Sequence, residues 1–412
     1  MLSMGLPRRY HPTRRTFPLE THLSLIIILG IVLVLFLGAV AALIKRKKID
    51  LWIGQYLYGD WRAPRTPTAG PKHVLFCFVD HYEPRWRGAD YATEVRRVDE
   101  WMAGYPKLCE GHQDADGRKP SHSFFFPEEE YRPEHLDKLV DLCKRGYGEI
   151  EIHLHHDNDT EAGLRQKLRG FVDTLVTRHK ALPVDPKTGR PMWSFIHGNW
   201  ALDNSHPDGK HCGVNNEITI LREEGCYADF TMPSAPDVTQ TSTVNSIYYA
   251  KDDPHGPKSH DRGVRVRVGQ AASGDLMMIQ GPLGLLWKMR KYGVMPRIEN
   301  GDVRESNPPV NARVDFWVDT GVHVAGRPEW VFVKVHTHGT QERDIKALLG
   351  QPTGDMFSHL ESRYNDGKNY VLHYVSAREM YNIAKAAEAG CSGNPNEYRD
   401  HVVPKPGYLD GQ

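Results

Sequence analysis

Residues 74–79, VLFCFV, form a continuous apolar run that ends at Asp80. Such a run predicts a strand buried on both faces, as in the centre of a parallel sheet. Segments with apolar residues at helical spacing alternate with further short strand-like segments. The predicted strands are 121–126, 146–154, 193–197, 226–230 and 330–336, and the predicted helices are 91–102, 133–143, 164–179, 216–224 and 377–389. This alternation predicts an α/β fold with a mainly parallel sheet.

Polar clusters follow several of these strands, and a parallel α/β barrel would bring such strand ends to one rim. We therefore expect a (β/α) barrel, distorted or incomplete, over residues 72–390. Within it, residues 248–311 are rich in Gly and Pro and are expected to form a loop-rich insertion over the site. Residues 391–412 are expected to be a C-terminal tail.

Charge and cysteine content exclude some classes of partner. Lys plus Arg (52) equals Asp plus Glu (52), whereas nucleic-acid-binding proteins usually carry a basic excess, so we expect no nucleic-acid partner. The six cysteines contain no C-x-x-C pair, so we do not expect a structural zinc knuckle.

A transmembrane helix is predicted over residues 23–44, which contain no charged side chain. At about 1.5 Å rise per residue this helix is long enough to cross a ~30 Å hydrocarbon core. A cleaved signal peptide is the alternative, because Ala39-Val40-Ala41 resembles a cleavage site. The run is longer than a usual signal-peptide core and a basic cluster follows it, which favours the membrane span. Residues 1–22 would then be a basic tail, and residues 45–71 a juxtamembrane segment and linker.

The orientation of this helix does not follow from flanking charge. Four arginines precede it and four basic residues follow it: Arg8, Arg9, Arg14, Arg15, Lys45, Arg46, Lys47 and Lys48. A long folded domain crosses a membrane largely regardless of flanking charge, whereas a tail with four arginines does not cross readily. We therefore expect a single-pass protein with a cytoplasmic N-terminus and an extracytoplasmic soluble domain.

Two clusters near the start of the soluble domain carry candidate chemistry. Residues 80–83 place Asp80 and Glu83 directly after a buried strand, where a solvated loop with a capping Asp is the plain alternative. Residues 149–157, EIEIHLHHD, place His153 and His155 on one strand face. That spacing suits two imidazoles on one metal ion, with Asp157 as a further oxygen ligand.

Two later clusters are candidates for substrate binding and proton transfer. His197, Asn199 and Trp200 follow a predicted strand; an amide and a ring suit sugar recognition, although a structural turn explains the Gly-Asn pair equally well. His336 and His338 end another strand, and a late His can act as a general acid. The alternative for His336 and His338 is an ordinary strand end at the surface. Asp229 repeats the pattern of a carboxylate after a strand.

The order of these motifs resembles that of the NodB-like polysaccharide deacetylases. In that family an Asp motif ends one strand, a Glu-Ile-Gly-x-His segment opens a His-x-x-x-His pair, and a late Leu-x-His supplies the acid. Residues 78–80, 149–157 and 335–338 are the similar segments of this chain. It departs from the pattern in having Asp80-His81 instead of two Asp residues and Asp157 instead of the second His. Residues 196–200 stand in place of an Arg-x-Pro-Tyr motif.

The resemblance implies a barrel of the polysaccharide deacetylase type and a divalent metal ion, with zinc expected. The candidate ligands are Asp80, His153, His155 and Asp157, with His156 as an alternative to the missing second His. An ion with one carboxylate and two imidazoles keeps a position open for water and can polarise an amide carbonyl. Asp80 or Glu83 would act as the base, and His336 or His338 would protonate the leaving amine. His197, Asn199, Trp200 and Asp229 are the candidate substrate-binding residues.

These features predict a membrane-anchored, metal-dependent hydrolase that removes N-acetyl groups from a cell-surface or exported polysaccharide. The expected partners are that polysaccharide, the lipid bilayer through residues 23–44, and polysaccharide-assembly proteins. Two alternatives remain open at this stage. One is a metal-free glycosidase on a similar barrel, which needs two carboxylates flanking the bond. The other is a non-catalytic scaffold in polysaccharide assembly or export.

Overall fold

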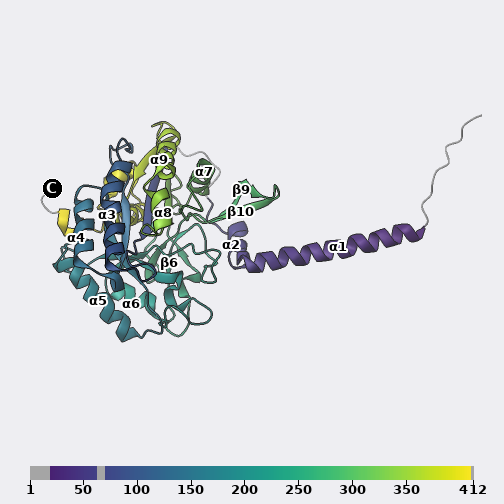
Figure 1. Ribbon diagram of the computed structural model, residues 1–412, viewed down its shortest axis with the longest axis horizontal. Helices are drawn as coiled ribbons and strands as arrows, with labels where there is room; N and C mark the ends of the chain where they lie inside the picture. Colours follow the sequence, from purple (N-terminus) through teal and green to yellow (C-terminus); the bar gives the residue numbers. More distant parts are fainter. Residues whose placement is uncertain (1–18, 63–69, 410–412) are drawn as a thin grey trace, which may run out of the picture.

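Strand β1 (Lys72–His81) contains the apolar run at residues 74–79, and every residue from Val74 to His81 is buried. It is a central strand of the sheet in a computed structural model that describes residues 19–62 and 70–409 (Figure 1). The parts of the predicted tails and linker at residues 1–18, 63–69 and 410–412 lie outside the described residues.

The sheet has the strand order β11-β1-β2-β3-β4-β5-β8-β6-β7, and β12 also pairs with β1. Pairing is parallel from β11 to β8 and antiparallel at β6 and β7. The strands are β2 (His122–Pro127), β3 (Gly148–Leu154), β4 (Trp193–His197), β5 (Cys226–Asp229), β6 (Ile247–Ala250), β7 (Gly263–Arg265), β8 (Leu276–Ile279), β11 (Trp330–Thr337) and β12 (Tyr370–Tyr374). The predicted α/β class with a mainly parallel sheet is confirmed. The hydrogen-bonded path is open at β11 and β7, so strand pairing in the described residues does not close a barrel.

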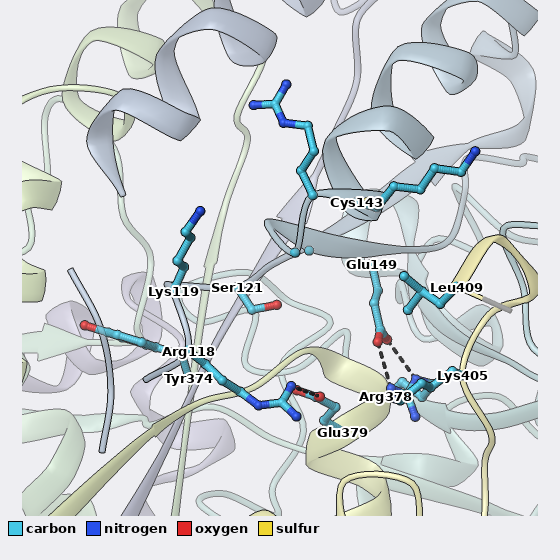
Figure 2. A pocket seen from close by; sticks show the side chains of 14 residues that line it. Arg118, Lys119, Ser121, Cys143, Glu149, Tyr374, Arg378, Glu379, Lys405 and Leu409 are labelled. Atoms are coloured by element: carbon cyan, nitrogen blue, oxygen red, sulfur yellow. Dashed lines mark hydrogen bonds and ion pairs between the residues drawn. The ribbon is translucent and has the colours of Figure 1, made fainter. Parts of the chain in front are cut away.

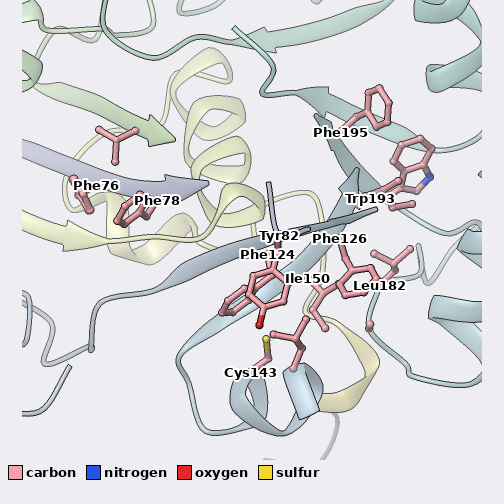
Figure 3. Close-up of a cluster of buried hydrophobic side chains, with 14 of the residues drawn as sticks. Phe76, Phe78, Tyr82, Phe124, Phe126, Cys143, Ile150, Leu182, Trp193 and Phe195 are labelled. Atoms are coloured by element: carbon pink, nitrogen blue, oxygen red, sulfur yellow. The ribbon is translucent and has the colours of Figure 1, made fainter. Parts of the chain in front are cut away.

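One face of the sheet is covered by helices that return the chain between parallel strands. Phe76 and Phe78 of β1 point to this helix-covered face, where they join a large apolar cluster (Figure 3). The helices are α3 (Tyr91–Leu108), α4 (Pro133–Lys144), α5 (Glu161–Thr177), α6 (Glu217–Glu223), α7 (Asn311–Thr320), α8 (Glu342–Leu348) and α9 (Gln351–Tyr364). Each contributes at least one apolar side chain to this cluster, which fixes the strands against the helix layer.

The opposite face packs against α10 (Ala377–Glu388), and we call it the α10 face. Cys77 and Val79 of β1 point to it because side chains alternate along a strand. The start of α10 is well defined: Ser376 and Glu379 form a reciprocal capping box there. The two faces therefore offer two separate environments at the carboxyl ends of the same strands.

Helix α1 (Leu19–Arg46) projects from the α/β body (Figure 1). From Ile26 to Arg46 it is long and apolar enough to cross a membrane, and it is not buried against the body. Helix α2 (Ile53–Tyr58) follows, and the adjoining Trp52 and Trp61 are buried against Val244 and Leu283. Packing of these indoles on the body thus joins α1 to the α/β body.

Residues 248–311, expected to be loop-rich, contain more regular structure than predicted. Most of β6, together with β7 and β8, extends the sheet there, and β9 (Gly284–Lys291) pairs with β10 (Met295–Glu299) as a separate antiparallel hairpin. The expected C-terminal tail also packs on the body over its described part, where Val403 is fully buried and Asn382 of α10 hydrogen-bonds its backbone. Short strands of three to five residues lack the long apolar runs that identify β1 from sequence.

Candidate metal centre

Two histidines of the β3 segment and a glutamate that follows β1 meet at the carboxyl ends of the strands. His153 lies in β3 and His155 just after it, so both project to the α10 face. Both imidazoles direct Nε2 to the same atom, Glu83 Oε1, at 3.3 Å from His153 and 3.6 Å from His155. We call Glu83, His153 and His155 the open centre, because the side chain of His155 is 30% exposed.

The other nitrogen of each imidazole is held in place by a hydrogen bond. Nδ1 of His153 donates to the carbonyl oxygen of Ile196 at 2.7 Å. Nδ1 of His155 donates to Glu129 Oε1 at 2.5 Å. Metal-ligating histidines in proteins are commonly oriented by such a bond, which leaves a lone pair on Nε2 for the ion.

Burial shapes the charge state of this centre. It lowers the pKa of His153 to about 3, so that imidazole is neutral and its Nε2 is an acceptor. Burial also raises the pKa of Glu83. For His155, burial opposes the charged form, but the Glu129 and Glu83 carboxylates outweigh it and the pKa is raised. The acceptor Nε2 of His153 therefore faces an oxygen of Glu83, and a cation between these two atoms would stabilise both.

His81 and His338 approach Glu83 from the side of β1 and β11. The ligand atoms of His81, Glu83 and His338 lie within 4.8 Å of one another. The two imidazoles stack with centroids 4.6 Å apart, and the ring of Trp200 lies 6.1 Å from that of His338. Of the predicted substrate-binding residues, Trp200 therefore lies beside the open centre.

Two acidic residues after β2 border the open centre. Glu129 holds His155, as described, and Glu130 accepts a hydrogen bond from the backbone N–H of Arg85 at 2.6 Å. Burial raises the pKa of Glu130 to about 8, with repulsion from Glu83 and Glu129 in the same direction. A carboxyl group with such a pKa can hold or release a proton near neutral pH.

Asp80 is placed away from the histidines of the open centre. It lies on the helix-covered face, where His122 Nε2 donates to its Oδ2 at 2.9 Å and the N–H of Gly339 donates to its Oδ1 at 2.5 Å. A Cβ at Gly339 would stand 2.0 Å from Asp80 Oδ2, so only glycine permits this approach. Asp80 thereby fixes the turn that follows His338. The reason is alternation along β1, which sends Asp80 and His81 to opposite faces.

Four other predicted site residues lie outside the open centre. His336 is buried, with Nε2 4.0 Å from Asp302 Oδ1, and burial lowers its pKa to about 3. Asp157 is exposed and accepts from the N–H of His211 at 2.6 Å. Asp229 is buried and accepts from Thr231, and Asn199 is exposed beside Trp200. None of these four belongs to the sets of potential metal ligands found in the described residues. Their predicted roles remain predictions.

His197, predicted to bind substrate, lies on the helix-covered face rather than beside the open centre. It is fully buried, and its Nε2 lies 2.9 Å from Nε2 of His156. The strand β4 explains this position, because Ile196 faces α10 and the next residue must face the helices.

A cavity of about 280 Å³ lies at the other end of the strands and is lined by Arg118, Lys119 and Arg145 among others (Figure 2). Two arginines of its lining are already paired: Arg378 binds Glu149 at 2.8 Å, and Arg118 binds Glu379 at 3.2 Å. The cavity is lined by Gly148, at the amino end of β3, whereas His153 and His155 lie at the carboxyl end of that strand. It is therefore separate from the open centre.

Sequence reasoning missed three members of this region: His81, Glu129 and Glu130. His81 had an available signal, because strand alternation separates it from Asp80 and places it with His153. Glu129 and Glu130 belong to an acidic triplet that directly follows β2, another strand end. Their contact with the histidines depends on the neighbouring positions of β2 and β3 in the sheet.

Comparison with protein-family models finds no match, and comparison with curated protein sequences finds none either. Among solved structures, the chain is similar to a protein from Parabacteroides distasonis provisionally described as a glycoside hydrolase/deacetylase. The similarity has a TM-score of 0.36 and 11% sequence identity, and it covers 78% of this chain and 72% of the other.

Proposed function

We propose that this chain is a metal-dependent hydrolase whose ion is held by Glu83, His153 and His155. One observation carries the proposal: the two imidazoles, each anchored through Nδ1, direct Nε2 to the same glutamate oxygen. One carboxylate and two imidazoles are the ligand set of several catalytic zinc sites, which keep a further position open. The partial exposure of His155 provides access to that position.

A divalent ion bound there would polarise a carbonyl group and lower the pKa of bound water. The protein residues around it divide the remaining tasks. Glu130, held by the backbone N–H of Arg85 on the side of β2, is the candidate proton acceptor. His338, on the opposite side and held by the Asp80–Gly339 contact, donates a proton to the leaving group.

The proposed substrate is an N-acetylated polysaccharide, and the reaction is removal of the acetyl group. Trp200 supports this choice, because an exposed part of an indole beside a hydrolytic centre suits the apolar face of a sugar ring. The motif order that resembles the NodB-like deacetylases points the same way. A glycosidase would instead use two carboxylates without the ion, so it would keep its activity after chelation.

The proposed location is the membrane, with α1 as a single span and the body outside the cytoplasm. The length and composition of α1 support the span. Fusion of alkaline phosphatase to the C-terminus should give an active reporter. An inactive reporter, with an active cytoplasmic reporter at the same position, would reverse the orientation.

The test uses the full-length protein purified in detergent. We expect acetate release from N-acetylglucosamine oligomers, loss of that activity after chelation, and recovery with Zn²⁺. Glu83→Gln should lose both the activity and the ion bound at the open centre. Glu128→Gln, in the same acidic triplet as Glu129, is the matched control and should keep both. Activity that survives chelation, or Glu83→Gln with full metal content, would contradict the proposal.

A further inference from the structure

A second group of potential metal ligands is enclosed on the helix-covered face. His156 Nε2 lies 2.9 Å from His197 Nε2 and 3.1 Å from Glu217 Oε1, and His197 Nε2 lies 3.5 Å from the same oxygen. The side chains of all three residues are 0% exposed. Three nitrogen and oxygen atoms that usually carry lone pairs therefore meet in a water-excluded space.

The outer atoms of this group are already used by other hydrogen bonds. His156 Nδ1 donates to Asp159 Oδ2 at 3.1 Å, and His197 Nδ1 donates to the carbonyl oxygen of Gly198. Glu217 Oε2 accepts from the backbone N–H of Asp203 at 2.6 Å. These contacts leave the two Nε2 atoms and Glu217 Oε1 directed at one point, and acceptors in such an arrangement need a cation.

A cysteine completes the group. Cys212 is fully buried, and its Sγ lies 3.4 Å from Glu217 Oε2. Its sulfur accepts from the backbone N–H groups of Asn204 at 3.3 Å and Val214 at 3.5 Å, contacts that stabilise negative charge on sulfur. One ligand atom from each of the four residues lies within 4.8 Å of the others.

We propose that His156, His197, Cys212 and Glu217 bind a structural Zn²⁺ ion, and we call this group the closed centre. Nitrogen, sulfur and oxygen donors in a set of four are typical of tetrahedral zinc. Four protein ligands leave no position for water or substrate, so the ion serves structure and not catalysis. This site is independent of the open centre and does not rest on the proposed hydrolase activity.

The closed centre joins the ends of β3 and β4, which pair in the sheet, to the β4–α6 connection and to α6. His156 follows β3, His197 ends β4, Cys212 lies in the connection from β4 to α6, and Glu217 begins α6. That connection has an irregular backbone, with positive φ at Asn199, Trp200, Asp203, Asn204 and His211. An ion in the closed centre holds this connection in place, and with it the Trp200 ring beside the open centre.

The metal-free alternative is a proton at the same point. His156 would then be an imidazolium that donates to Asp159 and Glu217, and Cys212 would be a thiol. The two states differ in metal content and in the bonding of the sulfur, and both can be measured.

The experiment uses the full-length protein in detergent, produced with Co²⁺ in place of Zn²⁺. A thiolate bound to Co²⁺ gives a charge-transfer absorption in the near ultraviolet. Among the potential metal groups in the described parts of the chain, only the closed centre contains a cysteine, so this absorption reports that centre alone. We expect the unaltered protein to show this absorption. Cys212→Ser should lose both the absorption and one metal ion per chain. Cys109→Ser changes another buried cysteine and should retain both.

A second measurement covers the case in which Cys212→Ser does not fold. X-ray absorption of the unaltered zinc protein should show a zinc–sulfur distance of about 2.3 Å, with about half a sulfur per zinc ion when both centres are occupied. Absence of a sulfur neighbour and of the cobalt–thiolate absorption would overturn the closed centre. If the thiolate absorption is present but chelation leaves the activity intact, the closed centre stands and the proposed hydrolase mechanism fails.

Discussion

The open and closed centres have the same inner arrangement in different surroundings. In each, two imidazoles anchored through Nδ1 direct Nε2 to one oxygen of a glutamate. The closed centre adds Cys212 and is fully enclosed, whereas the side chain of His155 in the open centre is 30% exposed. Access and the fourth ligand, rather than the histidines themselves, therefore separate a proposed catalytic site from a proposed structural one.

The two centres arise from consecutive residues of one strand end. His153 and His155 point to the α10 face, and His156 points to the helix-covered face. Strand alternation thus divides a single histidine-rich segment between two sites. A shift of one residue in the register of β3 with β4 would move each histidine to the opposite face of the sheet and disrupt both centres. The register of this strand pair therefore matters for the proposed function.

The largest predicted effect concerns the ion of the open centre. His153→Ala should reduce acetyl release to the background rate, because the proposed ion loses one of three ligands. Metal analysis should show one ion lost while the cobalt–thiolate absorption of the closed centre remains. His211→Ala, at a half-buried position outside both centres, should keep activity and metal content. Full metal occupancy in His153→Ala would remove His153 from the ligand set.

The next prediction separates stability from activity. Glu217→Gln should lower the free energy of unfolding by about 3–5 kcal/mol, because it removes the charged partner of a buried group. Thermal unfolding of the full-length protein measures this loss as a lower melting temperature. Asp208→Asn, in the same connection but with its side chain 62% exposed, should change stability by no more than about 0.5 kcal/mol. Equal melting temperatures for the two variants would speak against a structural ion.

A smaller effect is expected for the late histidines. His338→Ala should lower kcat by about 10²–10⁴-fold with metal content unchanged, the usual cost of losing a general acid. His336→Ala should have the weaker effect, because His336 is buried and does not belong to the group around Glu83. Single-variant kinetics on N-acetylglucosamine oligomers provide the test. Near-normal kcat in His338→Ala would assign the proton donor elsewhere, with His336 as the next candidate.

Much of the fold was predictable because its central strands carry strong local signals. The apolar run of β1 and the alternating pattern at residues 330–336 identify two neighbouring strands, and β4 has the predicted bounds. The pairing of His153 with His155 on one face also follows from strand periodicity. These features depend on residues that are close in sequence, which is why sequence patterns predict them.

The rest of the two centres depends on contacts between distant segments. Cys212 lies in an irregular connection, and Glu217 reaches His156 through a separation of 61 residues in sequence. No local pattern shows that Glu129 will meet His155 or that Asp80 will meet Gly339. Short strands such as β7 and helices such as α8 have too few residues for a clear periodicity. Tertiary packing determines the long-range contacts of the two centres and the positions of these short elements.

The smallest predicted effect comes from the residues that orient the histidines. Glu129→Gln keeps a hydrogen-bond acceptor for His155 but removes its charge, and Asp159→Asn does the same for His156. Loss of such a partner typically weakens metal affinity about 10–100-fold.

We expect Glu129→Gln to weaken only the open centre, measured by competition with a chromophoric chelator, and to leave the cobalt–thiolate absorption unchanged. Asp159→Asn should shift that absorption to higher Co²⁺ concentration and leave activity intact at saturating metal. The effect should be smaller at the closed centre, because Cys212 and the surrounding backbone hydrogen bonds keep the remaining ligands in place. If Asp159→Asn weakened the activity-linked ion and Glu129→Gln did not, the assignment of the two centres would have to be exchanged.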